Sequence, residues 1–178
     1  MKALKFVTGN LLLNKDVQVI GHQANCQNTF GSGIAKSIRE MYPSAYAADT
    51  LASRQLKNNL GEFSFGDIRF NTQFNQHGNK ICRIYNLYGQ NLGTDYCKRF
   101  DRKTDYEGLY SALEGMVNHL RPTDADLAMF DYNRSPIVGF PYKMGSDRGG
   151  GSWDIVQRLI EVAFDGYPAD VLVCKLET

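Results

Sequence analysis

Residues 21–35, which read GHQANCQNTFGSGIA, are the most informative segment of the sequence for the fold. The apolar run Val17–His22 predicts a buried strand that leads into this segment. Gly33–Met41 follows without a break, and its apolar residues recur at helical spacing. A strand, a glycine-containing loop and a helix in direct succession are typical of an α/β protein.

The rest of the chain repeats this alternation. Strands or short apolar runs are expected at Leu4–Thr8, Ser64–Phe70, Ile81–Leu87, Leu127–Phe130, Ile137–Phe140 and Val171–Lys175, and helices at Pro43–Leu56, Asp105–Leu120 and Trp153–Phe164. Thr104 and Glu107 predict a capping box for the longest helix, and Ser152 predicts an N-cap for the last. The pattern favours one domain over residues 1–178, with a sheet covered by helices on both faces.

Composition excludes several classes of function. Lys and Arg total 20 and Asp and Glu total 19, so the net charge of +1 does not recruit nucleic acid or a membrane. No apolar stretch is long enough to span a bilayer, and the N-terminus lacks the apolar core of a signal peptide, so we expect a cytoplasmic protein. The four cysteines form no CxxC pair, which predicts free thiols and neither a metal site nor a cofactor.

A second glycine-rich segment, residues 141–153, reads PYKMGSDRGGGSW and again lies between an apolar run and a helix. Glycines let backbone N–H groups approach a ligand closely, and a helix N-terminus favours an anion. Two such segments in one small domain predict a diphosphate site. The alternatives are a tight turn for residues 21–35 and a flexible turn for residues 141–153.

The order and contexts of these segments resemble those of a macro domain, the ADP-ribose-binding module. The resemblance rests on Gly9-Asn10-Leu11-Leu12 after the first strand, on His22–Ala35, and on Gly145–Trp153 with the helix that follows. The closest likeness is to the ADP-ribose 1″-phosphate phosphatases and their bacterial and bacteriophage relatives, because of His22 with Asn25-Cys26 and of Tyr85–Gln90. The fold that the resemblance implies is a three-layer α/β/α sandwich with a mixed sheet.

The resemblance also implies a role for each matching residue. Asn10 lies near the adenine, and Asn25 contacts the distal ribose. The residues expected to bind the ligand are Gly9, Asn10, Leu11, Asn25, Gly31, Ser32, Gly33, Ile34, Tyr88, Gly145, Ser146, Asp147, Arg148, Gly149 and Gly150. Two positions depart from the family pattern: Asn10 is often Asp, and Asp147 replaces a glycine beside the expected phosphates.

Three residues are candidates for catalysis: His22, Asn25 and Asp147. Phosphate monoester hydrolysis needs a proton donor or acceptor, and His22 and Asp147 compete for that role. Each also has a structural alternative, a packed histidine and a turn aspartate. Cys26 is not expected to be a nucleophile, because no Arg follows it in residues 27–34 to bind the phosphate.

The leading hypothesis is an enzyme that removes phosphate from ADP-ribose 1″-phosphate to give ADP-ribose. The alternatives are an ADP-ribosyl hydrolase acting on protein or nucleic acid, and a non-catalytic ADP-ribose-binding module. The partner is then a small ADP-ribose derivative, and a nucleic acid is not expected. The basic run Lys98–Lys103 is interpreted as a solvated loop, with a ligand phosphate or RNA as its other possible partners. The oligomeric state stays open.

Overall fold

The computed structural model describes residues 3–55, 59–69, 81–121 and 135–177. In them, six strands form one mixed sheet in the order β1-β6-β5-β2-β4-β3. The strands are β1 (Lys5–Thr8), β2 (Val19–Asn25), β3 (Phe63–Arg69), β4 (Ile81–Gln90), β5 (Val138–Pro141) and β6 (Val171–Lys175). All neighbours pair in parallel except β3, which is antiparallel to β4.

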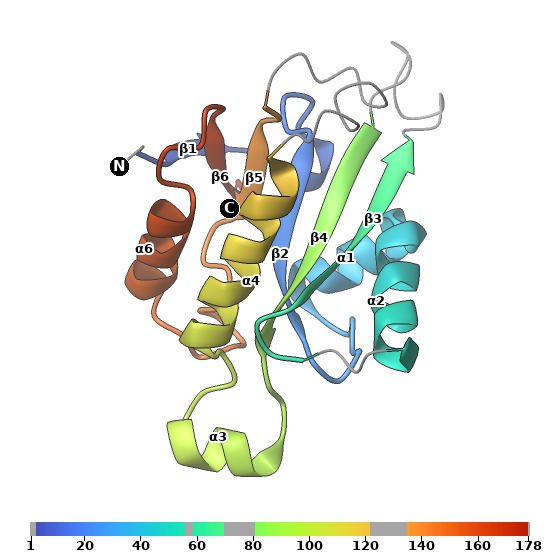
Figure 1. Ribbon diagram of the computed structural model, residues 1–178, viewed down its shortest axis with the longest axis vertical. Coiled ribbons are helices and arrows are strands. Elements are labelled where there is room, and N and C mark those ends of the chain that lie inside the picture. Colours follow the sequence, from blue (N-terminus) through green and yellow to red (C-terminus); the bar gives the residue numbers. More distant parts are fainter. Residues whose placement is uncertain (1–2, 56–58, 70–80, 122–134, 178) are drawn as a thin grey trace.

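Helices cover both faces of this sheet (Figure 1). The covering helices are α1 (Gly33–Met41), α2 (Pro43–Gln55), α4 (Tyr106–Leu120) and α6 (Trp153–Ala163). The described residues also form α3 (Thr94–Phe100), which lies away from the sheet, and a short 3-10 helix at Leu11–Leu13. One apolar cluster lies between the sheet and α4 with α6, and a second between the sheet and α1 with α2. The expected three-layer α/β/α sandwich with a mixed sheet is confirmed.

The strand β2 lies at the centre of the architecture. All seven of its residues are buried, because β5 and β4 pair with its two edges and a helical layer covers each face. Ile20 belongs to the α1 and α2 side and Val19 to the α4 and α6 side, so neighbouring residues of β2 contribute to different layers. Because of this alternation, the side chains of His22 and Gln23 face opposite sides of the sheet, near the carboxyl end of β2.

Three expectations about elements need correction. β2 runs on to Asn25, so His22 lies inside the strand and not at its end. The helix α4 is capped by Asp105, whose side chain accepts a hydrogen bond from the Gly108 N–H, and not by a Thr104–Glu107 box. The basic run begins within a helix, α3, and not in a loop. The run Leu127–Phe130 and the end of the second helix at Leu56 lie outside the described residues.

Candidate functional site

Five parallel strands end at the same edge of the sheet, and four of them lead into segments that the sequence analysis singled out. From one side to the other these are Gly9-Asn10 after β1, the second loop (Tyr142–Ser152) after β5, the first loop (Cys26–Ser32) after β2, and the α3 segment (residues 91–105) after β4. Ligands of α/β sheets bind beyond the carboxyl ends of strands. The fold therefore aligns the segments that the sequence predicted, although they are far apart along the chain.

Asn25 organises the first loop from the end of β2. Its Oδ1 accepts hydrogen bonds from the N–H groups of Gln27 at 3.0 Å and Thr29 at 3.2 Å, and its Nδ2 donates to the carbonyl of Thr29 at 2.8 Å. The side chain is 8% exposed. Three of its hydrogen bonds thus go to the loop itself, so Asn25 sets the shape of the first loop whatever it contacts in a ligand.

The first loop ends at Ser32, the N-cap residue of α1, whose side chain makes no capping hydrogen bond. Within the described residues, the N–H groups of Gly33 and Ile34 donate to no acceptor. Unpaired donors at the first turn of a helix form a site that favours anions. The predicted ligand-binding residues Gly31 to Ile34 therefore present backbone donors at the carboxyl edge of the sheet.

The second loop is a series of turns with a left-handed backbone at Lys143, Gly145 and Gly150. Its carbonyl groups face the connection between α3 and α4. The Gly145 carbonyl accepts from Thr104 Oγ1 at 2.7 Å, and the Gly149 carbonyl accepts from the N–H of Thr104 at 3.0 Å. The same loop also has unpaired donors, since the N–H groups of Asp147 and Arg148 have no acceptor in the described part of the chain.

Gln23, which the sequence did not single out, supports the second loop from below. Its Nε2 donates to the Gly89 carbonyl and, at 3.3 Å, to Thr104 Oγ1. Gly145 has a φ of +73°, and a Cβ there would lie 2.0 Å from Gln23 Oε1, so both the backbone conformation and the contact favour glycine. Gln23 follows His22 on β2 and faces the α4 side, a placement that strand alternation could have indicated.

His22 lies on the opposite face of β2 and is fully buried. Its Nε2 lies 2.7 Å from Asn86 Oδ1, and its ring packs edge-on against Phe30 with 5.5 Å between centroids. Desolvation lowers the pKa of His22 to about 4, against the smaller opposing effects of Asn86 and of the backbone of Gln23. The neutral, inaccessible imidazole is at odds with direct proton transfer, which requires contact with substrate or water.

Tyr88, which the sequence analysis placed among the ligand-binding residues, is buried like His22. The side chain is 1% exposed, and its hydroxyl donates to Asp49 Oδ1 at 2.8 Å on α2. Ser64 Oγ lies 2.7 Å from the same hydroxyl and 3.1 Å from Asn86 Nδ2. A buried polar chain thus links His22 through Asn86, Ser64 and Tyr88 to Asp49, behind the first loop.

Gly9 and Asn10 lie at the far side of the edge. The Gly9 N–H donates to the Lys175 carbonyl at 2.8 Å, and Asn10 Oδ1 accepts from the Leu12 N–H at 2.9 Å. Leu11 contributes its side chain to the core beneath α1, so only its backbone can meet a ligand. Asn10 is exposed, with its Nδ2 free of partners among the described residues, and remains placed for the predicted contact with an adenine.

The second loop has three charged residues, Lys143, Asp147 and Arg148, and all three are exposed. Asp147 and Arg148 are neighbours in sequence. No ion pair joins them, although both lie in the described ranges, so pairing with Arg148 does not neutralise Asp147. Ser146 Oγ donates to the Met144 carbonyl at 3.4 Å. Asp147 is therefore the accessible titratable group among the three catalytic candidates.

Cys26 begins the first loop, and its thiol is held in the protonated form. Burial raises its pKa to about 11, and the negative charges of Asp105, Asp49 and Glu62 add to that effect. A thiol with this pKa is a poor nucleophile at neutral pH. Within the described ranges, no three His, Cys, Asp or Glu side chains could together hold a metal ion, and no helix could cross a membrane.

A six-stranded mixed sheet with two anion-favouring loops at one edge is the architecture of a macrodomain, and the chain has the macrodomain fold. The macrodomain of Mycobacterium tuberculosis DarG superposes with a TM-score of 0.69 over 99% of both chains, at 19% identity. Thermosipho africanus DarTG in complex with ADP-ribose gives a TM-score of 0.70 at 14% identity, covering 97% of this chain and 42% of that one.

Sequence comparison gives one further relative. An uncharacterized 17.5 kDa protein from the tk-vs intergenic region of Enterobacteria phage T4 is 26% identical over 161 residues, 89% of this chain and 88% of the phage protein. No family model matches the chain. At these identities the solved structures establish the fold.

Proposed function

We propose that the carboxyl edge of the sheet binds ADP-ribose and that the protein hydrolyses ADP-ribose 1″-phosphate to ADP-ribose and inorganic phosphate. The observation that carries the proposal is the pair of loops after β2 and β5, each with backbone donors left unpaired within the described residues. Two sets of N–H groups at adjacent strands suit the two phosphates of a diphosphate. The ADP-ribose complex of the structurally similar DarTG supports the choice of ligand.

The order of segments along the edge gives the ligand a direction. Asn10 after β1 would meet the adenine, the two loops would hold the diphosphate, and the first loop, shaped by Asn25, would reach the distal ribose. The second loop would contribute Gly145 to Gly150. In this arrangement the 1″-position lies on the β4 side of the molecule.

Hydrolysis requires a water molecule to attack and a proton for the departing oxygen. We assign proton transfer to Asp147, which is exposed on the second loop, and a positioning role to His22, which is fully buried beneath Phe30. Asn25 holds the first loop and the distal ribose. The N–H groups of both loops would stabilise the negative charge of the phosphates during the reaction.

A paired assay tests this function. Purified protein is offered ADP-ribose 1″-phosphate and, separately, an ADP-ribosylated protein and an ADP-ribosylated oligonucleotide, and free phosphate and free ADP-ribose are measured. The proposal expects phosphate release from the first substrate. Release of ADP-ribose from either macromolecule alone would assign the protein to the ADP-ribosyl hydrolases, and binding without any turnover would make it an ADP-ribose-binding module.

Asp147→Asn tests the assignment of the proton. We expect it to lower phosphate release about 100-fold or more, the usual contribution of one acid or base. It should also tighten ADP-ribose binding, because it removes a negative charge beside the diphosphate. Glu177→Gln, an exposed carboxylate near the C-terminus, is the matched control. Wild-type turnover by Asp147→Asn would rule out Asp147 as the proton donor.

A further inference from the structure

The α3 segment is the part of the molecule that the proposed function does not yet use. It leaves the sheet after β4 and returns at α4, and it extends beyond the sandwich at the end where β4 terminates (Figure 1). Two stems connect α3 to the sandwich, residues 90–93 before it and residues 101–104 after it. They are paired with each other, since the Asn91 N–H donates to the Lys103 carbonyl at 2.9 Å and Gln90 forms a β-bridge with Thr104. None of the seven α3 residues is buried.

Each stem is hydrogen-bonded to one of the two loops. On one side, Gln27 of the first loop donates to Asn91 Oδ1 at 3.1 Å and accepts from the Leu92 N–H at 3.0 Å. On the other side, the Lys103 N–H donates to the Gly149 carbonyl of the second loop at 2.9 Å. The two stems, which together form the base of α3, are therefore hydrogen-bonded to both loops.

The sheet order places α3 at a defined end of the proposed ligand. Asn10 follows β1 at one edge strand, and α3 follows β4, beyond the first loop on the opposite side. If the adenine lies at Asn10 and the diphosphate lies across the loops, the substituent on the distal ribose points toward the base of α3. This step rests on the proposed function.

The base of α3 is basic although the chain as a whole is nearly neutral. Residues 98–103 contain four cationic side chains and one acidic side chain, Asp101, in a protein of net charge +1. Asp95 lies on the first turn of the same helix. Lys98, Arg99 and Lys103 are exposed.

Arg102 is held in place by its neighbours. Its Nε donates to the Thr104 carbonyl at 2.9 Å, and its guanidinium carbon lies 4.5 Å from the ring centre of Tyr106 and 5.4 Å from that of Phe100. A Cβ at Gly150 would lie 3.5 Å from the Cβ of Arg102, so the arginine borders the second loop. An arginine fixed in this way loses little side-chain entropy when it binds a phosphate.

We propose that Arg102, together with Arg99 and Lys103 of the same basic run, binds the phosphoryl group carried by the distal ribose, and that α3 thereby selects the phosphorylated ligand over ADP-ribose. The hydrogen bonds from the base of α3 to both loops place these cations next to the proposed diphosphate site. The assignment makes α3 a specificity element for the proposed reaction.

The test compares dissociation constants for ADP-ribose and ADP-ribose 1″-phosphate, measured by stopped-flow displacement of a fluorescent ADP-ribose analogue before turnover occurs. We expect the wild type to prefer the phosphorylated ligand by about 10-fold or more, the value of one charge-assisted hydrogen bond to an arginine. Arg102→Gln should abolish the preference, and Lys103→Gln and Arg99→Gln should reduce it. Affinity for ADP-ribose itself should change less than about 3-fold, because that ligand lacks the phosphoryl group.

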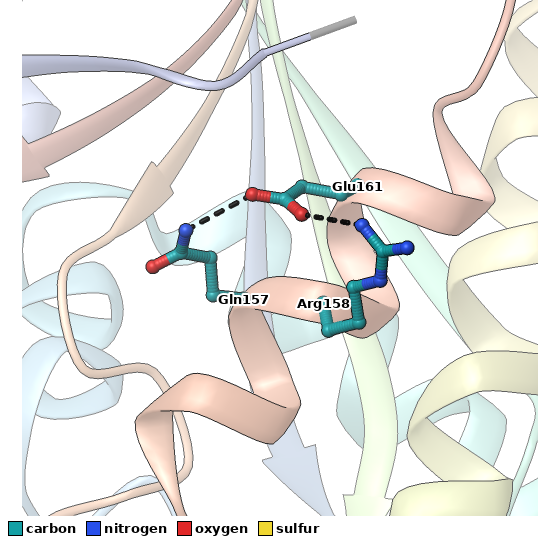
Figure 2. A network of polar contacts seen from close by, with 3 residues as sticks. All are labelled: Gln157, Arg158 and Glu161. Carbon is teal, nitrogen blue, oxygen red and sulfur yellow. Dashed lines mark hydrogen bonds and ion pairs between the residues drawn. The ribbon is translucent and has the colours of Figure 1, made fainter. Parts of the chain in front are cut away.

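Arg158→Gln is the charge-matched control. Arg158 lies on α6, where its side chain pairs with Glu161 at 3.1 Å and Gln157 donates to the same carboxylate at 2.9 Å (Figure 2). This variant removes one positive charge outside α3 and should keep the wild-type preference. Because Arg102 also contacts Tyr106, Lys103→Gln and Arg99→Gln, whose side chains are exposed, keep the test valid if Arg102→Gln does not fold.

Different failures have different meanings. No binding of ADP-ribose by the wild type would overturn the proposed function. Binding of ADP-ribose with no preference for the phosphorylated ligand, or with a preference that all three α3 variants retain, would overturn the assignment of α3 alone. The assignment would also be overturned if a single-stranded oligonucleotide bound the wild type but not the α3 variants, while the preference for ADP-ribose 1″-phosphate stayed unchanged. That result would make α3 a nucleic-acid-binding surface.

Discussion

At the scale of single residues, the tautomer of His22 follows from its partner. Asn86 Nδ2 donates to the Ala45 carbonyl at 2.9 Å, which leaves Oδ1 as the acceptor for His22 Nε2. The proton of the neutral ring is therefore on Nε2. The Nδ1 atom is buried and has no hydrogen-bond partner within the described part of the chain. A second proton would have to occupy this apolar position beside Phe30.

This burial predicts a specific pH dependence of stability. His22 has a pKa of about 4 when folded and 6.5 when unfolded, so the unfolded chain binds a proton first as the pH falls. The contribution is constant above about pH 6.5 and is lost progressively down to about pH 4. We expect His22→Gln to reduce the loss of unfolding free energy between pH 7 and pH 5 by about 2 kcal/mol.

Urea unfolding of both proteins at the two pH values measures this difference. The carboxylates that also respond to pH are common to both proteins, so the difference isolates His22. An equal loss of stability in the wild type and in His22→Gln would contradict the buried, neutral state of the imidazole.

Asn25 gives a second prediction at this scale. Asn25→Ala removes three hydrogen bonds that shape the first loop, so ADP-ribose should bind about 10- to 100-fold more weakly. Asn118→Ala on the exposed side of α4 is the control. Titration calorimetry of both variants checks the result, and unchanged affinity in a folded Asn25→Ala protein would exclude the first loop from the binding site.

At the scale of elements, the second loop depends on a neighbour that is distant along the chain. Thr104 is fully buried between α3 and α4 and donates to the Gly145 carbonyl. Thr104→Val keeps the shape but leaves that carbonyl with one partner fewer. We expect faster amide exchange in Gly145–Gly151 and about 10-fold weaker ADP-ribose binding.

Thr104→Ser should restore both properties to near wild type, since it keeps the hydroxyl. Thr94→Val, at the exposed start of α3, is the matched control. Hydrogen exchange followed by mass spectrometry reads the loop directly. Equal exchange in wild type and Thr104→Val would show that the loop keeps its shape without the hydroxyl.

Elements with strong periodicity were predictable, and those held by distant contacts were not. The buried stripe of α4 and the apolar run of β6 are local patterns, and the structure places both as expected. The end of β2 was misjudged because His22, Gln23 and Asn25 are polar yet buried, with partners supplied by β4 and the loops. The helix α3 has no buried face and therefore no periodic signal.

The same reasoning applies to the candidate site. The two glycine-rich loops and Asn10 could be named as candidates because their residues are close together in sequence and follow strands. The hydrogen bond from Tyr88 to Asp49, 39 residues earlier on α2, could not be predicted because no local pattern links the two residues. Gln23 was not singled out, and Thr104 was assigned only to a helix cap, because their contact spans 81 residues of sequence.

At the scale of the whole molecule, the sheet order creates the site. β1, β5, β2 and β4 are separated in sequence, but their parallel pairing, completed by β6, brings their carboxyl ends to one edge. In the proposed binding mode, the adenine, diphosphate and distal-ribose positions follow one another along that edge from β1 to β4, and no single segment contains the whole site. A ligand that spans the edge should be bound better than a fragment that occupies only part of it.

Titration calorimetry of the wild-type protein with ADP-ribose tests this arrangement most directly. The arrangement predicts saturable binding of one ADP-ribose per chain, and weaker binding of AMP, which lacks the second phosphate and the distal ribose and so reaches only part of the edge. No heat of binding with ADP-ribose up to millimolar concentration, or equal affinity for AMP and ADP-ribose, would contradict it.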